Sequence, residues 1–563
     1  MVWQQSYNPF ASMVLSTAFA AVPVVVMLVG LGFLHLKAHV AAGLGLLAAI
    51  AIAVFAYGMP AEMAGKAAFL GGLTGLLPIG WIVLNIIFLH RLADENGSCK
   101  IQEDTIANVT QDRRLQLLLI AFSYGAFFEG AAGFGTPVAV TAAILIGLGF
   151  SPLAASGLSL IANTAPVAYG ALGTPIITMA KVHGYDLMAL SAMVGRQLPF
   201  FSLLVPFWLI WAFAGRKGMM EIWPAILVSG LSFAIPQFLV SNYIGPELVD
   251  VIAAISSMAC LILFLRVWKP KVIWTSTSLK GHQEELDAAA LAGKPGGAAA
   301  PAKSFTKHPT DVVVRAWMPW LVLTVFVFVW GLPVVKTALN GIFAPSFPIA
   351  GLHQLIEKMP PVVPKPAKEG AVYVFNLLSA TGTGILLAAI IGGLYMKYNP
   401  LQLVQSYGRT LWRVRYSLLT IVLMLGLGTL TRYSGLDTTL GLAFANTGVF
   451  YPFFGTMMGW LGVALTGSDT ASNVLFGGMQ RVAAEQLGLS PNLMGAANSS
   501  GGVMGKMIDA QSIVVASTAT GWFNHEGDIL RYVFFHSLAL ASLVGLFVTL
   551  QAYVYPFTLM VIK

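Results

Sequence analysis

Charged residues are scarce in this chain. Only 10% of its 563 residues are Asp, Glu, Lys or Arg, whereas 57% are hydrophobic, and the mean hydropathy is +0.79. Soluble domains contain roughly 25% charged residues. Cysteine is almost absent as well: Cys99 and Cys260 lie far apart in the sequence, so they predict neither a disulfide framework nor a metal site. This composition excludes a water-soluble globular domain.

The motifs of the common enzyme classes are missing or broken. The segment "SGGVMGKM" resembles a phosphate-binding loop, but its first glycine position is Ser500 and its lysine is followed by Met507. The segment "GFGTPV" lacks the third glycine of a dinucleotide site, and no H-E-x-x-H or G-x-S-x-G sequence occurs. We therefore expect no enzymatic activity, no metal and no cofactor. Without a nucleotide site, any transport must be driven by a gradient of an ion or solute.

Long apolar runs fill most of the chain instead. At about 20 apolar residues per crossing, they predict an all-α polytopic membrane protein with about 12 to 14 transmembrane helices. The first run, Ser12 to Leu36, has no basic residue before it and is long enough to span, so it indicates a transmembrane helix and not a cleaved signal peptide. The net charge of +8 comes from Lys and Arg between the runs, which favours contact with lipid over nucleic acid.

The basic residues also predict the orientation and the domain boundaries. The stretch from Arg266 to Arg315 contains eight Lys and Arg, both ends included, around an Ala/Gly/Pro-rich segment that is typical of a flexible linker. We expect residues 1–269 to form a first membrane repeat, residues 270–312 a flexible cytoplasmic linker, and residues 313–563 a second membrane repeat. The uncharged N-terminus and the loop near 336–371 are then extracytoplasmic.

Isolated acids occupy matching places in the two halves. Glu129 and Asp469 are each the only charged residue in a long uncharged stretch. Each sits in a cluster of small and polar residues, "FFEGAAGFGTPVAV" (127–140) and "ALTGSDTASNVLF" (464–476), which is followed by an L-G-apolar-S-P turn (148–152 and 487–491) and by a second such cluster. Superposing the turns gives an offset of 339 residues. This pattern predicts an internal repeat, and in transporters such repeats are often inverted.

The small and polar clusters predict broken or re-entrant helices within the bilayer. Unpaired backbone groups are tolerated at that depth only when they are buried in protein or line a cavity, and a carboxylate there usually faces a pathway. The N-terminus of a broken helix attracts anions, and neighbouring Ser, Thr and Asn can bind a carboxylate and a hydroxyl. Together these parts suit a small hydroxylated anion. The alternative is close helix packing, which uses the same small residues.

Two basic residues have two interpretations each. Arg196 in "MVGRQLPF" could bind a substrate carboxylate or extend from a helix end toward the interface. Lys506 could supply the same countercharge, or it could pair with Asp509, three residues further on, along one helix face.

Several longer motifs resemble the bacterial lactate permease family. They are "FFEGAAGFGTPVAVTAAILIGLGF", "NTAPVAYGALGTPI", "MVGRQLPF", "SNYIGPEL", "LTGSDTASNVLF", "GGVMGKMI" and "LQAYV". The resemblance covers nearly the whole chain, with poor matches only near 275–312 and 336–371. One departure is Asp509-Ala510, where the family pattern has Ser-Pro. That departure puts a shared role for Asp509 in doubt.

The resemblance implies a multi-pass, secondary active transporter of the bacterial inner (plasma) membrane. In this family L-lactate, and often D-lactate or glycolate, is taken up by proton symport. The resemblance also implies the architecture of the ion transporter superfamily, in which two inverted repeats carry re-entrant hairpins and a transport domain moves against a scaffold. An uncoupled carboxylate channel or facilitator is the alternative. The oligomeric state stays open.

We expect the substrate site near the midplane, between the breaks at 129–137 and 466–473. Glu129 and Asp469 are the candidate proton carriers, because a buried carboxyl can load and release a proton. Arg196 or Lys506 would supply a countercharge. The candidate substrate-binding groups, some of them backbone amides, belong to Gly133, Phe134, Gly135, Asn163, Thr164, Gly467, Ser468, Thr470, Asn473, Asn498 and Ser499.

Overall fold

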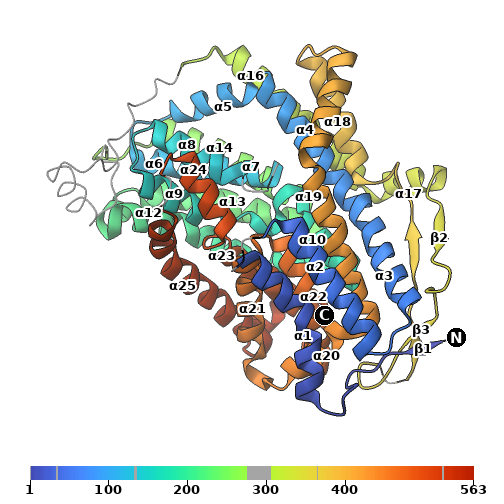
Figure 1. Ribbon diagram of the computed structural model, residues 1–563. Helices are drawn as coiled ribbons and strands as arrows, with labels where there is room; N and C mark the ends of the chain where they lie inside the picture. Colours follow the sequence, from blue (N-terminus) through green and yellow to red (C-terminus); the bar gives the residue numbers. More distant parts are fainter. Residues whose placement is uncertain are drawn as a thin grey trace.

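The computed structural model describes residues 2–562 except 33, 35, 132, 134, 135, 275–305, 364, 523 and 524. The described chain is mostly helical (Figure 1). The α-helices of the first half are α1 (Met13–Gly32), α2 (Ala38–Ala51), α3 (Ala61–Thr74), α4 (Trp81–Glu95), α5 (Ser98–Ala107), α6 (Arg113–Leu117), α7 (Gly125–Ala131), α8 (Thr136–Gly147), α9 (Pro152–Ala162), α10 (Gly170–His183), α11 (Leu187–Val194), α12 (Leu198–Glu221), α13 (Trp223–Tyr243) and α14 (Val249–Val267).

The α-helices of the second half are α16 (Thr310–Gly331), α17 (Pro333–Ile342), α18 (Thr381–Tyr395), α19 (Pro400–Ser434), α20 (Leu436–Ala445), α21 (Tyr451–Thr466), α22 (Asp469–Gln486), α23 (Pro491–Gly505), α24 (Ala510–Ala519) and α25 (Glu526–Tyr553). Shorter π and 3-10 segments are η1 (Ile52–Ala56), η2 (Gly75–Gly80), η3 (Leu118–Tyr124), η4 (Val167–Tyr169), η5 (Gly448–Phe450) and η6 (Phe557–Met560). The strands are β1 (Trp3–Gln4), β2 (Ser346–Pro348), β3 (Ile356–Lys358), β4 (Ala367–Lys368) and β5 (Val372–Val374).

The predicted helical membrane protein is confirmed. Among the described residues, eight helices are long and apolar enough to cross a membrane, or nine if the bent pair α9 and η4–α10 counts as one span. Four shorter apolar helices, at Met13–Met27, Pro137–Gly147, Thr381–Tyr395 and Leu436–Ala445, do not reach that length. The predicted range of 12 to 14 is reached only when these short helices are included. Several of the apolar runs in the sequence are therefore short or broken helices and not complete crossings.

Long helices and broken helices form two groups. Helices α3, α4, α18 and α19 stand side by side in Figure 1 and pack pairwise, α19 on α3 and α18 on α4. The broken helices, α7–α10 and α21–α24, lie beside them and contact each other through α10 and α22. Both halves of the sequence contribute to both groups. The two predicted membrane repeats thus interlock within one body.

The long helix α19 has clear sequence signals at both ends. Asn399 accepts a hydrogen bond from the Gln402 backbone at 2.8 Å, and the Gln402 side chain accepts one from the Asn399 backbone at 2.9 Å. This capping box satisfies two N–H groups that the helix itself leaves unpaired. At the other end Gly435 adopts φ +82°, a left-handed conformation that glycine tolerates. These signals determine where α19 begins and where it ends.

The internal repeat has a counterpart in local structure. Each half shows the order helix, break, helix, turn, helix, break, helix, over α7–α10 and over α21–α24. The two turns have the same geometry: Gly149 and Gly488 have φ +90° and +68°, and Ser151 and Ser490 cap the next helix, each followed by a proline at its start. The inverted relation between the two copies stays a prediction.

Some of the glycines in these clusters allow close packing of helices, which was the alternative interpretation of the small residues. A side chain at Gly501 would overlap the backbone of Thr456, and one at Gly505 would overlap Trp460. Helices α21 and α23 therefore approach backbone to backbone, the arrangement that small residues permit in membranes. The cluster at 496–505 thus belongs in part to a packing seam.

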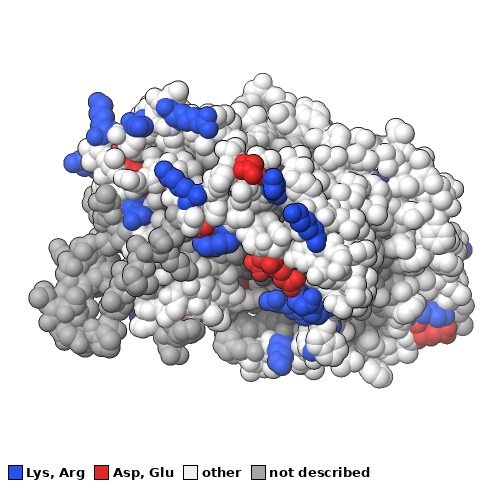
Figure 2. Space-filling model, turned by 90° about the horizontal axis from the view of Figure 1, so that it is seen from above, with Lys and Arg blue, Asp and Glu red and all other residues white. Residues whose placement is uncertain are grey.

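The termini and loops divide into two faces. Strand β1 pairs with β3, so the N-terminus and the loop after α17 lie on one face. On the other face Arg114 bonds Asp112, Glu221 and the Val272 carbonyl, which joins three loops. Lys and Arg gather on the face seen from above (Figure 2), where α5 and the start of α16 lie in Figure 1. The positive-inside rule assigns this basic face to the cytoplasm.

The linker predicted at 270–312 falls mostly outside the described residues. Its described start is attached to the basic face, because the Arg113 backbone N–H donates to the Trp274 carbonyl at 2.9 Å. Its described end reaches α5, where the His308 ring lies 2.9 Å from Asp104. The next helix, α16, begins at Thr310.

Candidate functional site

All four helix breaks of the two repeats meet at one cavity. The cavity measures about 180 Å³. Its wall includes residues from the α7–α8 break, the α9–α10 break, the α21–α22 break and the α23–α24 break, and one stretch of α19 completes it. The lining residues that carry the following argument are Glu129, Gly133, Gly170, Ala171, Thr174, Ser417, Thr420, Gly467, Ser468, Asp469, Thr470 and Lys506.

The α21–α22 break presents a helix N-terminus to this cavity. Gly467 ends α21 with φ +72°, and the Ser468 hydroxyl accepts a hydrogen bond from the Ala471 backbone at 3.2 Å. Asp469 and Thr470 form the first turn of α22. Partial positive charge at this helix end favours an anion in the cavity.

Asp469 is held by neutral donors and leaves one oxygen free. Its Oδ2 accepts hydrogen bonds from the Ser499 hydroxyl at 2.5 Å and from the Asn473 amide at 3.2 Å. Its Oδ1 is buried and has no hydrogen-bond partner in the described part of the chain. Asn498 in turn donates a hydrogen bond to the side-chain oxygen of Asn473 at 2.9 Å and so fixes the Asn473 amide. The network therefore positions Asp469 without neutralising it.

Asn473 also joins the two repeats. Its side-chain amide lies 3.3 Å from the carbonyl of Pro175 in α10. Helices α10 and α22 pack along this contact. This contact ties the second break of the first repeat to α22 of the second.

Lys506 connects the third and fourth breaks. Its ammonium donates to the Gly467 carbonyl at 2.6 Å and lies 3.4 Å from the Asp509 carboxylate. It also interacts electrostatically with Glu129 and Asp469. Of the described residues that line the cavity, Lys506 alone is basic. One buried cation is thus shared among three carboxyl groups.

Asp509 has a structural role at the start of α24. Its Oδ1 accepts a hydrogen bond from the Ser512 backbone at 2.7 Å and so caps α24. Asp and Ser are both favoured caps. The predicted pairing with Lys506 is present, but across the break between α23 and α24, since α23 ends at Gly505.

Glu129 lies at the first break, in close contact with the second. An ideal Cβ at Gly170 would lie 2.6 Å from Glu129 Oε1, so only glycine leaves room for the carboxylate. Gly133, with φ +59°, lies next to the same carboxyl. Glu129 Oε2 is buried and has no hydrogen-bond partner among the residues described. Its carboxyl group is therefore available to a proton or a ligand in the cavity.

The second break contains a left-handed turn. Ala171 and Leu172 have φ +46° and +56°, and Gly173 has φ +75°. Left-handed backbone costs a non-glycine residue roughly 1–2 kcal/mol, and such strain is concentrated at functional sites. The turn brings Ala171 and Thr174 to the cavity wall.

The other predicted residues divide into three sets. Asn473, Asn498 and Ser499 do not line the cavity but support Asp469 from behind. Asn163 and Thr164 are buried at the second break. The Thr164 hydroxyl donates to the Ile161 carbonyl, and the Asn163 side chain interacts with the Glu129 carboxyl. Phe134 and Gly135 lie outside the described residues.

Arg196 lies elsewhere. Its guanidinium donates to Asn242 at 3.1 Å and to the Met560 carbonyl at 3.0 Å. Arg196, which lies in the turn between α11 and α12, therefore holds the C-terminal segment in place. It does not line the cavity. Of the two cations considered for the substrate carboxylate, Lys506 is the one at the site.

Two features of the site were not predicted. The α19 wall, with Ser417 and Thr420, carries no charge or motif that distinguishes it from a packing helix. Asp250, at the start of α14, is 1% exposed, and neither of its oxygens has a hydrogen-bond partner in the structure as described. Its Cβ lies against Gly130, beside Glu129. In the sequence it follows Glu247 and resembles an ordinary loop acid.

No group of three or more His, Cys, Asp or Glu in the described ranges is placed to hold a metal ion. The carboxyl groups of the cavity instead surround Lys506.

Comparisons with known proteins find relatives over nearly the whole chain. The glycolate permease GlcA of Escherichia coli K12 is 46% identical over 99% of both chains. The L-lactate permeases of Bacillus subtilis 168 and E. coli K12 are 44% and 42% identical, over 99% and 98% of both chains respectively. The crystal structure of the YdaH transporter of Alcanivorax borkumensis aligns over 86% of both chains, with 13% identity and a TM-score of 0.42.

The family assignment follows from the sequence match. Residues 16–555 match the family described as L-lactate permease, and the relatives above extend the match over nearly the full length. Together with the membrane-spanning helices, these matches identify a multi-pass transporter of the bacterial inner membrane. The chain belongs to the L-lactate permease family.

Proposed function

We propose that this protein takes up L-lactate and related 2-hydroxymonocarboxylates, including D-lactate and glycolate, by proton symport. The observation that carries the proposal is the meeting of four helix breaks around two isolated carboxyls, Glu129 and Asp469, and one lysine, Lys506. The relatives named as lactate and glycolate permeases support this substrate class.

The substrate carboxylate binds between Lys506 and the N-terminus of α22. Lys506 already donates to the Gly467 carbonyl, so the anion enters at the positive end of the helix and next to the ammonium. Hydrogen bonds to charged groups stabilise by about 1.5–3 kcal/mol each. The hydroxyls of Ser468, Thr470 and Thr174 line the same wall and can pair with the 2-hydroxyl of the substrate.

The size of the cavity favours a short acid. Its volume of about 180 Å³ is below the roughly 300–1,000 Å³ of pockets that hold drug-sized ligands. A substrate with a second carboxylate would also place another negative charge beside Glu129 and Asp469, which have only Lys506 as a cation among the described lining residues. The site therefore suits a monocarboxylate of two or three carbons.

Coupling follows from the sharing of one cation by several acids. When the substrate anion binds Lys506, the carboxyls lose part of their attraction to that ammonium, and a neighbouring negative charge favours proton binding. Binding of the proton likewise favours binding of the anion, since such coupling is reciprocal. Glu129 and Asp469, each with an oxygen unpaired in the described structure, are the proton carriers in this proposal.

Alternating access would move the broken helices against the long ones. The cavity lies between the breaks and α19, so sliding of the α7–α10 and α21–α24 group along α19 would expose it to either side. Secondary transporters commonly bind substrate at such an interface between a moving and a fixed group of helices.

Reconstitution tests the proposal. Purified protein in liposomes with an alkaline interior should accumulate labelled L-lactate above its external concentration, and a protonophore should abolish the accumulation. Counterflow against unlabelled acids should rank L-lactate, D-lactate and glycolate above dicarboxylates. Uptake that only equilibrates and ignores the protonophore would indicate the uncoupled facilitator instead.

A further inference from the structure

A second cavity lies at the extracytoplasmic end of α19. It measures about 380 Å³ and is bordered by α3, η2, α10, α19 and the strand β5. The residues that determine its chemistry are Thr74, Lys181, Asn376, Thr429 and Arg432. We call this space the outer vestibule.

The outer vestibule is basic. Lys181 and Arg432 line it, and no Asp or Glu is among its described lining residues. The remaining polar groups are hydroxyls and one amide, which accept and donate hydrogen bonds without charge. A cavity of this composition attracts anions and repels cations.

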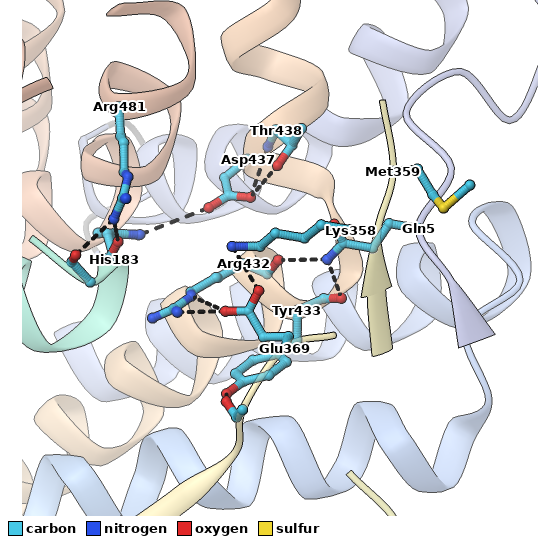
Figure 3. A network of polar contacts seen from close by, with 12 residues as sticks. Gln5, His183, Lys358, Met359, Glu369, Arg432, Tyr433, Asp437, Thr438 and Arg481 are labelled. Carbon is cyan, nitrogen blue, oxygen red and sulfur yellow. Dashed lines mark hydrogen bonds and ion pairs between the residues drawn. The ribbon is translucent and has the colours of Figure 1, made fainter. Parts of the chain in front are cut away.

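Arg432 is already engaged as a structural group (Figure 3). Its guanidinium donates to the Glu369 carboxylate at 2.9 Å and to the Val182 carbonyl at the end of α10, also at 2.9 Å. Glu369 bonds Lys358 on β3 as well, at 2.7 Å. Burial alone would raise the pKa of Glu369, but the charges of Arg432 and Lys358 outweigh it and hold the pKa below its ordinary value. Figure 3 shows this network joining α19 to the extracytoplasmic loop.

Lys181 is different, because it is exposed and no hydrogen bond or ion pair ties its ammonium within the described structure. Its charged neighbour, Lys336, is itself paired with Glu247 at 3.8 Å. Lysines near the ends of membrane helices usually extend to the interface. Lys181 instead faces a cavity, and its charge has no partner there.

The outer vestibule lies on the same seam as the central cavity. Both are bounded by α10 and α19: Thr174 and Leu425 line the central cavity, and Lys181 and Thr429 line the vestibule. Gly428 lies between them on α19, and a side chain there would overlap Val474 and meet Val182. Between the residues of α19 that line the two cavities, Gly428 thus packs against Val182 of α10 and Val474 of α22.

We propose that the outer vestibule is a second binding site for a short carboxylate anion, the transported substrate itself, before it reaches the central cavity. This inference rests on the proposed function for the identity of the anion. Lys181 binds the carboxylate, and Thr74, Thr429 and Asn376 lie within the same cavity to pair with its hydroxyl. Opening of the contact at Gly428 then passes the anion along the α10–α19 seam.

The reactivity of a thiol placed in the vestibule reports its charge preference and its occupancy without relying on transport. In a background in which Cys99 and Cys260 are replaced by Ser, Thr74→Cys places a thiol in the vestibule. Intact cells are treated with membrane-impermeant thiosulfonate reagents that carry a negative or a positive charge. We expect the anionic reagent to react faster than the cationic reagent. Lys181→Gln should lower the ratio of the two reaction rates about tenfold. L-lactate should slow the reaction, whereas inorganic phosphate at the same concentration should not.

Controls separate this inference from the proposed function. Lys368→Gln, an exposed lysine on β4 outside the vestibule, should leave the ratio unchanged. Lys181→Gln should also raise the KM for uptake several-fold with little change in kcat, and Lys181→Arg should restore it. A ratio insensitive to Lys181→Gln, or equal protection by phosphate, would overturn the inference even if proton-coupled uptake is found. Charge preference and lactate protection that persist in a protein without proton-coupled accumulation would instead reject only the proposed coupling.

Discussion

The ammonium of Lys506 donates a hydrogen bond to the carbonyl of Gly467 at 2.6 Å, across 39 residues of chain. This contact joins the third and fourth helix breaks and holds a positive charge beside the N-terminus of α22. A carbonyl at a helix break has no partner within the helix, so the lysine satisfies it, and in the proposed function the same ammonium binds the substrate anion.

Removal of this charge should weaken substrate binding. Lys506→Gln keeps a donor for the Gly467 carbonyl but deletes the cation, and we expect L-lactate affinity to fall roughly tenfold or more, as expected for a lost charge-assisted hydrogen bond. Binding of labelled L-lactate to purified protein measures the loss. Arg196→Gln is the matched control, because it deletes a cation outside the cavity. Equal losses in the two variants would place the site elsewhere.

The two isolated acids should separate coupling from exchange. Glu129→Gln or Asp469→Asn removes a proton carrier, so accumulation driven by a pH gradient should disappear while lactate exchange across proteoliposomes continues. Asp509→Asn should preserve coupling, since Asn also caps α24. Loss of exchange together with accumulation, in protein that folds and inserts, would assign these acids to binding and not to proton transfer.

Gly170 should be essential for the geometry of Glu129. Its φ is ordinary, but a methyl group there would strike Glu129 Oε1, so Gly170→Ala should reduce coupled uptake at least about fivefold by displacing the carboxyl, an overpacking effect. Gly65→Ala is the control, because nothing lies within 4 Å of the added Cβ. Normal transport by Gly170→Ala would show that the position of Glu129 is not critical.

The 2-hydroxyl of the substrate should contribute to recognition. Without it, the hydroxyls of the cavity wall lose a hydrogen-bond partner on the substrate, which is worth about 0.5–1.5 kcal/mol. Lactate should therefore compete better than propionate for labelled lactate uptake, and glycolate better than acetate. Propionate that competes as well as lactate would exclude a hydroxyl-binding site.

The extracytoplasmic ion network should make stability depend on pH. The pKa of Glu369 is lowered in the folded protein, so its stabilising effect is fully present above its ordinary value near 4.5 and is lost as the pH falls through the folded pKa. The difference in Tm between the wild type and Glu369→Gln should be largest near neutral pH and shrink below about pH 4.5. A difference that stays constant down to pH 3 would show that the ion pairs do not stabilise the loop.

The sequence revealed the site wherever a residue departed from its surroundings. Glu129 and Asp469 stand alone in uncharged stretches, and the glycines near them indicated helix breaks. Both acids line the cavity. The Leu-Gly-apolar-Ser-Pro turns likewise predicted the repeat, because each element of the motif has a specific conformational role.

Contacts between distant segments could not be predicted in this way. Arg196 and Lys506 were equivalent candidates in the sequence, and only packing places Lys506 at the cavity and Arg196 against the C-terminal segment. Asp250 was missed because its burial depends on Gly130 of another helix. The polar residues of α19 were missed because helix periodicity does not indicate which face meets a cavity.

Protection of two cysteines by substrate tests the central claim most directly. In the background without Cys99 and Cys260, Thr174→Cys and Thr470→Cys place thiols on the cavity wall from α10 and α22, one in each repeat. Both should react with a membrane-permeant thiol reagent, and saturating L-lactate should protect both, because one anion occupies the point where the breaks meet. Protection at only one position, or reaction unaffected by lactate at both, would contradict a single substrate site shared by the two repeats.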